Sequence, residues 1–319
     1  MKVLDLDATS YRRPMLHADA RVWVEKNCYV DIWIETIHAA GCEPMAMLPF
    51  VVSLDVEGDQ WTFFKPKHDK RWELYGIDVK ELNCWRPLLE HAQEHLGAGK
   101  LISVESDAWW LPDTSGTDYR RQHTKSTIVL NDLDASARRL GYFHNAGYFE
   151  LEGDDFAGLF AAAGAGLPPY VEFVRLEGLH RLEPHELVTR AAALSRAHFD
   201  RRPANNPVRR FRTRFAADLP WLQGEPMSTF HLYAFATLRQ CGAGAEVAAT
   251  FLHWLGCHGH RGLEPAATAY QRVAASAKGM QFTLARAVTG RSVDFAPMFD
   301  AMERDWDQAT AVLAARHGD

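Results

Sequence analysis

Hydrophobic and polar positions in the first half of the chain follow a pattern typical of a sheet with a few helices. Apolar side chains at helical spacing predict a helix over residues 28–40, with Asn27 as its N-cap and Gly41 as its end. A second apolar stripe predicts a helix over residues 78–97. Strands of a mostly antiparallel sheet are predicted where β-branched and aromatic residues gather, at 46–55, 60–65, 101–111, 126–134, 138–145 and 147–151.

From about residue 155 the pattern becomes helical. Residues 201–207 (RRPANNP) form a break within this part of the chain. The predicted helices cover 155–163, 184–199, 208–217, 226–240, 243–257, 264–289 and 294–315. The sequence therefore predicts an α+β protein with two domains, residues 1–178 holding the sheet and residues 179–319 forming a helical bundle.

Composition and charge narrow the class of protein. The chain has 319 residues and a net charge of −6, which argues against a dedicated nucleic-acid-binding protein. Residues 1–180 hold 18 basic and 28 acidic side chains, whereas residues 181–319 hold 17 and 13. No apolar run is long enough to span a membrane, and the first residues lack the apolar core of a signal peptide. We therefore expect a cytoplasmic protein that does not bind membranes.

Six arginines lie close together within and just after the predicted break. They either bind an acidic partner or form a solvated helix face. These residues are Arg201, Arg202, Arg209, Arg210, Arg212 and Arg214.

The cysteines argue against a disulfide framework, because their number is odd and no CxxC motif occurs. His253, His258 and His260 lie near Cys257, but a zinc site would need a matching second pair of ligands. We interpret this group as residues at a helix end and expect no metal site.

Cys28 is the candidate nucleophile, because it falls in the first turn of a predicted helix, where the helix dipole favours a thiolate. His123, which precedes a predicted strand, is the candidate base, and Asn145 is the candidate acceptor that orients it. Asn27 and Asp107 are candidate supporting residues, Asn27 for the oxyanion and Asp107 for the histidine or a substrate amine. The alternatives are a buried cysteine in an apolar role, a surface histidine and a turn-forming aspartate.

Polar residues near the candidate base, and on one helix of the second domain, are candidates for substrate binding. The helix residues either line a pocket at the domain interface or are ordinary exposed positions. The candidates are Asp113, Tyr119, Arg120, Lys125, His144, Lys278, Gln281 and Arg286.

Several long strings carry a family resemblance. WVEKNCYVDIWIE, GDQWTFFKP, LYGIDV, LPDTSGTDYRRQHTKSTI and GYFHNAGYFEL together resemble a bacterial family known as domain of unknown function 1839. The first half also resembles, more distantly, the N-terminal domain of the butirosin-type acyltransferase and hence the papain-like cysteine enzymes. That resemblance implies Cys28 as nucleophile and His123 as base, although Val22 stands where papain-like enzymes carry the oxyanion-hole glutamine.

The resemblance also implies a donor and a partner. The donor is an aminoacyl thioester on the phosphopantetheine arm of a carrier protein, and an amino acid:carrier-protein ligase is a possible partner. We therefore expect a cysteine-dependent aminoacyl or acyl transferase that acts on an amine, with no permanently bound cofactor. The alternatives are a cysteine hydrolase, either a peptidase or a thioesterase, and a non-catalytic protein that binds a carrier protein.

Overall fold

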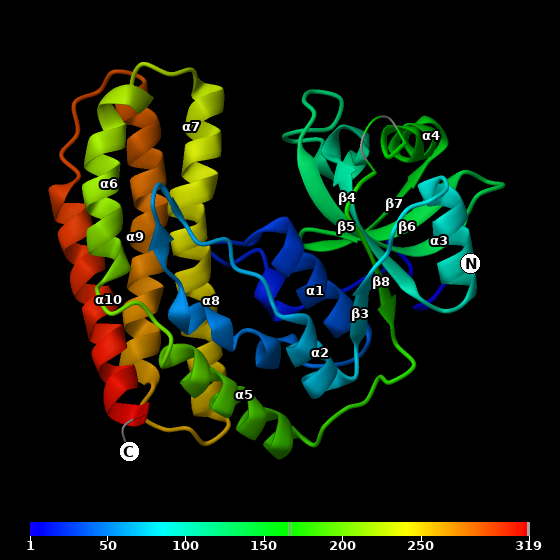
Figure 1. Ribbon diagram of the computed structural model, residues 1–319. Helices are drawn as coiled ribbons and strands as arrows, with labels where there is room; N and C mark the ends of the chain where they lie inside the picture. The colour runs from blue at the N-terminus through cyan, green and yellow to red at the C-terminus, as the bar shows by residue number, and fades with distance from the viewer. Residues whose placement is uncertain (165, 167, 318–319) are drawn as a thin grey trace. The chain divides into compact units, whose positions relative to one another are not determined.

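The computed structural model describes residues 1–164, 166 and 168–317, and these residues form two compact units (Figure 1). The first unit contains residues 1–19, 27–44 and 67–182. The second unit contains residues 20–26, 45–66 and 183–319, of which 318 and 319 lie outside the described part. The second unit therefore includes two segments that precede residue 179 in the sequence.

An antiparallel sheet of six strands forms the centre of the first unit. Its strand order is β3-β8-β4-β5-β6-β7. The strands are β3 (Asp78–Glu81), β4 (Leu101–Asp107), β5 (Lys125–Asp134), β6 (Arg139–His144), β7 (Gly147–Glu152) and β8 (Val171–Arg175). Because side chains alternate between the faces of a strand, the sheet presents two different sides to its helices.

One side of the sheet packs against α3 (Leu88–Gly97) and α4 (Gly153–Ala162). Ile102, Ile128 and Leu159 belong to this buried apolar core. The other side packs against α1 (Cys28–Ala39), whose central residues are fully buried. A further helix of this unit, α2 (His68–Tyr75), ends at Gly76 in the left-handed conformation.

The first turn of α1 confirms the predicted helix start. Asn27 is extended, and its side-chain oxygen accepts a hydrogen bond from the Val30 amide at 3.0 Å. An N-cap of this kind satisfies one of the amides that a helix leaves unpaired. Cys28 is therefore the first residue of α1, as the sequence predicted.

The second unit is mainly helical. A short hairpin, β1 (Val56–Glu57) and β2 (Gln60–Trp61), packs with the helices of this unit. The helices are α5 (Pro184–Phe199), α6 (Pro207–Leu222), α7 (Met227–Ala234), α8 (Gln240–Cys257), α9 (Glu264–Val288) and α10 (Ala296–His317), with a π-helical turn at Phe235–Arg239. The predicted α+β class with a helical C-terminal region is confirmed.

Two of the predicted elements are wrong. Residues 46–55 form short 3-10 helices, including Pro49–Ser53, rather than a strand. The apolar residues in this segment are nearly continuous, so they show neither the alternation of a strand nor the spacing of a helix. The hydrophobic pattern alone therefore could not distinguish a strand from a short helix. Residues 78–97 contain the strand β3 and the helix α3, because Pro87 ends any helix that would continue through it.

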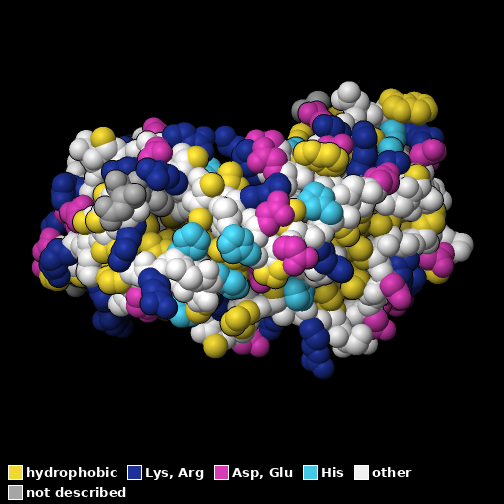
Figure 2. Space-filling view, turned by 90° about the horizontal axis from the view of Figure 1, so that it is seen from below, with side chains coloured by type: hydrophobic (Ala, Val, Ile, Leu, Met, Phe, Trp, Pro, Cys, Tyr) yellow, Lys and Arg dark blue, Asp and Glu magenta, His cyan; other side chains and the backbone are white. Residues whose placement is uncertain are grey.

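The arginine cluster binds acidic residues of its own unit. Arg209 pairs with Glu303 and Asp307, and Arg212 pairs with Asp300 at 2.7 Å. Arg210 pairs with Asp55, and Arg214 pairs with Asp218. Acidic and basic side chains are interspersed on the face shown in Figure 2. This arrangement favours the interpretation of these arginines as a helix face with internal partners.

A membrane-spanning helix would need about 20 apolar residues. None of the helices in the described residues is both long enough and apolar enough for that.

Candidate functional site

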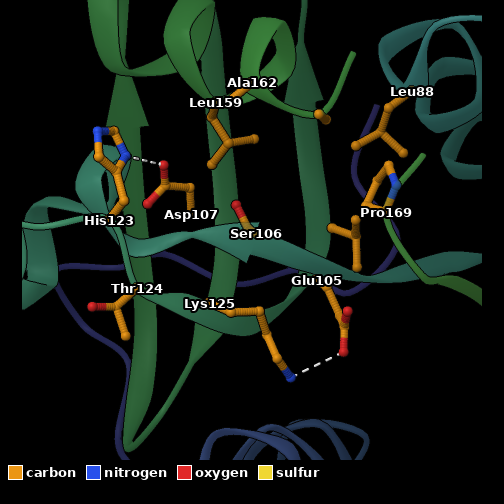
Figure 3. A pocket seen from close by; sticks show the side chains of 12 residues that line it. Leu88, Glu105, Ser106, Asp107, His123, Thr124, Lys125, Leu159, Ala162 and Pro169 are labelled. Carbon is orange, nitrogen blue, oxygen red and sulfur yellow. Dashed lines mark hydrogen bonds and ion pairs between the residues drawn. The ribbon is translucent and has the colours of Figure 1, made fainter. Parts of the chain in front are cut away.

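A cavity of about 330 Å³ opens on the α3 and α4 side of the sheet (Figure 3). Its polar wall comes from the end of β4 and the start of β5, and its apolar wall comes from the helices. The residues that line it are Leu88, Val104, Glu105, Ser106, Asp107, His123, Thr124, Lys125, Leu159, Ala162, Ala163 and Pro169. Three candidates from the sequence, Asp107, His123 and Lys125, therefore lie at one cavity.

His123 is held in place by two neighbours. Its Nδ1 lies 2.6 Å from Asp107 Oδ2, and its ring stacks on Trp109 with the centroids 4.6 Å apart and the planes 12° apart. Asp107 Oδ1 accepts a hydrogen bond from the Trp109 amide at 3.0 Å, which ties the three residues together. An ionised Asp107 fixes the tautomer with the proton on Nδ1, so Nε2 is the nitrogen that can take a proton from a substrate.

The histidine side chain is 70% exposed, whereas the Asp107 side chain is only 24% exposed. The ring is thus accessible to a substrate while its orienting carboxylate is largely covered. A base needs both properties, since it must reach a substrate proton and keep a fixed orientation.

A second cavity, of about 850 Å³, adjoins the first through Asp107 and His123. Arg120 lines it and stacks over Trp110 at 4.3 Å. Arg120 also forms an ion pair with Asp155 on α4, and the Tyr119 hydroxyl donates to the same carboxylate at 2.8 Å. Both predicted binding residues therefore anchor the loop before His123 to α4, and Arg120 also faces an open volume.

Lys125 belongs to the rim rather than to the interior of the first cavity. Its Nζ lies 2.9 Å from Glu105 Oε1, and both side chains point away from α4 in Figure 3. The register pairs Glu105 with Thr127 and Asp107 with Lys125, so Lys125 and Thr127 share the side of β5 that faces α1.

Cys28 lies on that α1 side of the sheet. Its Sγ is 3.7 Å from Thr127 Oγ1, and the residue is half-buried. His123 points to the α4 side, where it lines the cavity with Leu159 and Ala162 (Figure 3). The structure thus gives the predicted nucleophile and the predicted base different neighbours: the Cys28 thiol lies against Thr127, whereas His123 lies against Asp107 and Trp109.

Asn145 follows a strand, as predicted, but it is not the residue that hydrogen-bonds His123 Nδ1. It lies in the turn between β6 and β7 with a φ of 43°, a left-handed conformation that asparagine tolerates better than most residues. The acceptor that orients His123 is Asp107, which was the alternative role considered for that aspartate. The Asn27 side chain, a candidate for the oxyanion, caps α1.

Sequence reasoning missed a hydrogen-bonded chain of three buried side chains near the cavity. His144 Nδ1 lies 2.6 Å from Asp113 Oδ2, and His144 Nε2 lies 2.6 Å from Ser126 Oγ. Asp113 and His144 were expected to bind substrate separately, and Ser126 was not considered. No distinctive signal marked Ser126 in the sequence, because β5 also holds other polar residues such as Thr127 and Asn131.

Two family models match the sequence. The model of the DUF1839 N-terminal domain matches residues 12–176, and the model of the DUF1839 C-terminal domain matches residues 184–315. The chain belongs to the DUF1839 family. This confirms the resemblance seen in the sequence strings. No curated protein matches the chain.

In this DUF1839 protein, the N-terminal family domain contains Cys28, Asp107, Ser126 and His123 together. Of the candidate catalytic and substrate-binding residues named from the sequence, only Lys278, Gln281 and Arg286 lie in the C-terminal family domain.

Lys278, Gln281 and Arg286 lie on α9 of the second unit. The Lys278 ammonium stands over the Trp23 ring at 4.4 Å, and burial, followed by the charge of Arg239, lowers the pKa of Lys278. Gln281 is half-buried and Arg286 is exposed. Both cavities described above are lined by residues of the first unit only.

The histidines near Cys257 end α8, as expected. Cys257 Sγ lies 3.6 Å from His253 Nε2, and His258 Nδ1 lies 2.8 Å from the Trp254 carbonyl oxygen. Within residues 1–164, 166 and 168–317, no three His, Cys, Asp or Glu side chains are grouped so as to hold a metal ion.

Proposed function

We propose that this protein transfers an aminoacyl or acyl group from a thioester to an amine, with His123 as the base. The observation that carries the proposal is the His123–Asp107 pair in the lining of a cavity, with its 2.6 Å hydrogen bond and a histidine side chain that is 70% exposed. Transfer to an amine needs a base, because the attacking amine loses a proton as the amide forms.

The step involves few groups of the protein. His123 Nε2 takes a proton from the acceptor amine, the amine nitrogen bonds to the carbonyl carbon, and the carbon–sulfur bond breaks. The leaving thiolate receives a proton, and Asp107 stabilises the imidazolium that forms in between. Exchange of a thioester for an amide is favourable, so positioning and proton transfer are the main tasks of the protein.

The donor class comes from the resemblance to acyltransferases. It is an aminoacyl group on the phosphopantetheine arm of a carrier protein, with an amino acid:carrier-protein ligase as the protein that loads it. The two cavities meet at His123. One cavity would hold the donor arm and the other would hold the acceptor. Such a donor is made in the cytoplasm, which is where we place the protein.

A covalent route through Cys28 is the second candidate. A papain-like origin of the first unit is supported by α1 packing on an antiparallel sheet with Cys28 in its first turn. The amides of that turn favour a thiolate and an oxyanion. In this route Cys28 would carry the acyl group as a thioester, and a group other than His123 would accept the thiol proton.

The experiment follows the consumption of an aminoacyl-pantetheine thioester by the complete chain, with and without a primary amine. A transferase forms amide only with the amine present, whereas a hydrolase consumes the thioester without it. Cys28→Ala retains the rate if His123 acts directly on the amine and abolishes turnover in the Cys28 route. A protein that binds the thioester without consuming it would contradict both routes.

A further inference from the structure

A second set of reactive groups lies beside the His123 cavity. Ser126 Oγ, His144 and Asp113 form a continuous hydrogen-bonded chain with two links of 2.6 Å. The order of the groups, hydroxyl to Nε2 and Nδ1 to carboxylate, is that of a serine nucleophile with its base and orienting acid. Such a triad is recognised by geometry rather than by the order of its residues in the chain.

The surroundings of Asp113 fix the direction of the hydrogen bonds. The Tyr142 hydroxyl donates to Asp113 Oδ1 at 2.5 Å. Burial, followed by the charge of Asp113, raises the pKa of Tyr142 well above its ordinary value, so the phenol keeps its proton. Asp113 then accepts the Nδ1 proton of His144 at its other oxygen, and Nε2 is left to accept the hydroxyl proton of Ser126.

Ser126 lies beside a residue of the cavity wall. It pairs directly with Ser106 across β4 and β5, and opposed residues of an antiparallel pair point to the same side of the sheet. Ser106 lines the cavity and points into it (Figure 3). Ser126 is 7% exposed, whereas Ile128, two residues further along the strand, is fully buried.

We propose that Ser126 is a nucleophile that takes up an acyl group from the donor, with His144 as its base and Asp113 as the residue that orients His144. The inference rests on the proposed acyl transfer and adds to it a covalent acyl intermediate on Ser126. Ser126 Oγ bonds to the thioester carbonyl carbon and passes its proton to His144 Nε2. The carbon–sulfur bond breaks, and the leaving thiolate takes that proton.

The second half of the reaction restores the serine. The acceptor amine attacks the carbonyl carbon of the Ser126 ester and loses its proton to His123. The bond between that carbon and Ser126 Oγ then breaks, and Ser126 Oγ takes the proton from the His123 imidazolium. The first half therefore uses the His144–Asp113 pair, and the second half uses the His123–Asp107 pair, which lines the cavity.

The test uses a small alkyl fluorophosphonate, which reacts with activated serines by forming an oxygen–phosphorus bond and releasing fluoride. We expect one adduct by intact mass, mapped to Ser126 by peptide analysis, and no adduct in Ser126→Ala. Asp113→Asn and His144→Gln should slow the labelling at least tenfold, because they remove the fixed tautomer and the base. Ser103→Ala, a buried serine on the same strand pair that faces the other side, is the matched control and should label at the wild-type rate.

The probe separates this inference from the proposed function. If wild-type protein shows no adduct, or if the adduct lies on Ser106, the Ser126 assignment is overturned even when His123 variants lose transfer. If labelling continues unchanged in Asp113→Asn, the chain of hydrogen bonds is structural. If Ser126 labels as expected but no thioester is consumed, the triad stands and the thioester donor is wrong.

Discussion

The orientation of the His123 ring depends on two neighbouring residues. The ring is exposed, yet the stacked Trp109 and the Asp107 carboxylate hold it in one orientation. The sequence predicted this histidine as a base from its place before a strand, and it named Asp107 among the residues that could orient it. Ser126 could not be found in this way, since its partners come from the loop at residue 113 and from a different strand.

Asp107→Asn tests the orienting partner. An asparagine at this position no longer accepts the Nδ1 proton through a charged oxygen, so the wrong tautomer becomes populated and the imidazolium loses its stabilising charge. We expect the turnover number for transfer to fall about 100-fold or more, with little change in KM. Asp5→Asn, at an exposed position in the N-terminal segment, should not alter the turnover number. An equal loss in both variants would show that Asp107 has no special role.

Glu172 on β8 is a buried carboxylate that affects stability. Burial alone would raise its pKa, but the hydrogen bond from His68 and its charge, together with Tyr170 and Arg71, bring the pKa below the ordinary value of 4.5. The charged form is therefore favoured in the folded state. This contribution to stability is present above pH 4.5 and is lost as the pH falls through the lower, folded-state pKa.

Glu172→Gln should remove this dependence on pH. In urea unfolding the variant is expected to be less stable than wild type at pH 7, and the difference should shrink as the pH falls below 4.5. The control is Glu177→Gln, because the Glu177 side chain is 60% exposed. It should change neither the stability at pH 7 nor the dependence of stability on pH. A difference that grows toward low pH would have the opposite sign and would show that the charged form of Glu172 does not stabilise the fold.

Among the elements, those with a clear period were predicted best. The helix predicted over 184–199 has the bounds of α5, because Pro184 suits the first helical position and the apolar residues repeat along one face. The strands β5, β6 and β7 agree with the prediction to within one residue at both ends of each strand. In contrast, β8 was missed. Its five residues are too few to show a clear alternation, and its partners, β3 and β4, come from much earlier in the chain.

Asn27→Ala tests the start of α1. The variant loses the hydrogen bond from the Val30 amide, and we expect the free energy of unfolding to fall by about 1 kcal/mol. Asn27→Asp keeps a capping oxygen and should restore most of the loss. The measurement is the urea midpoint of both variants and of wild type. A fully stable Asn27→Ala would mean that the cap does not determine where α1 begins.

At the scale of the whole molecule, the second unit depends on residues from the first half of the sequence. Trp61 is buried, and its ring lies 5.4 Å from that of Trp306 and 6.1 Å from that of Phe211. The Val22 and Trp23 amides donate to the Glu246 carboxylate at 2.9 and 3.0 Å. A boundary drawn by sequence position alone cannot include these contacts, because they join residues that are far apart in the sequence.

A fragment of residues 179–319 should therefore fold poorly. It lacks Trp61, which covers the core of this unit, and it leaves the buried Glu246 carboxylate without its amide partners. We expect the fragment to bind a fluorescent hydrophobic dye and to lose the cooperative melting of the complete chain. A fragment that melts cooperatively and binds no dye would show that residues 20–26 and 45–66 are dispensable for this unit.

The role of His123 as the base of an acyl transfer can be measured through the transfer rate of His123→Gln. The assay follows amide formation from an aminoacyl-pantetheine thioester and a primary amine, with the exposed His185→Gln as the matched histidine control. We expect a loss of about 100-fold or more for His123→Gln, with an unchanged melting temperature, and the wild-type rate for His185→Gln. A His123→Gln variant that transfers at the wild-type rate would show that this histidine is not the base.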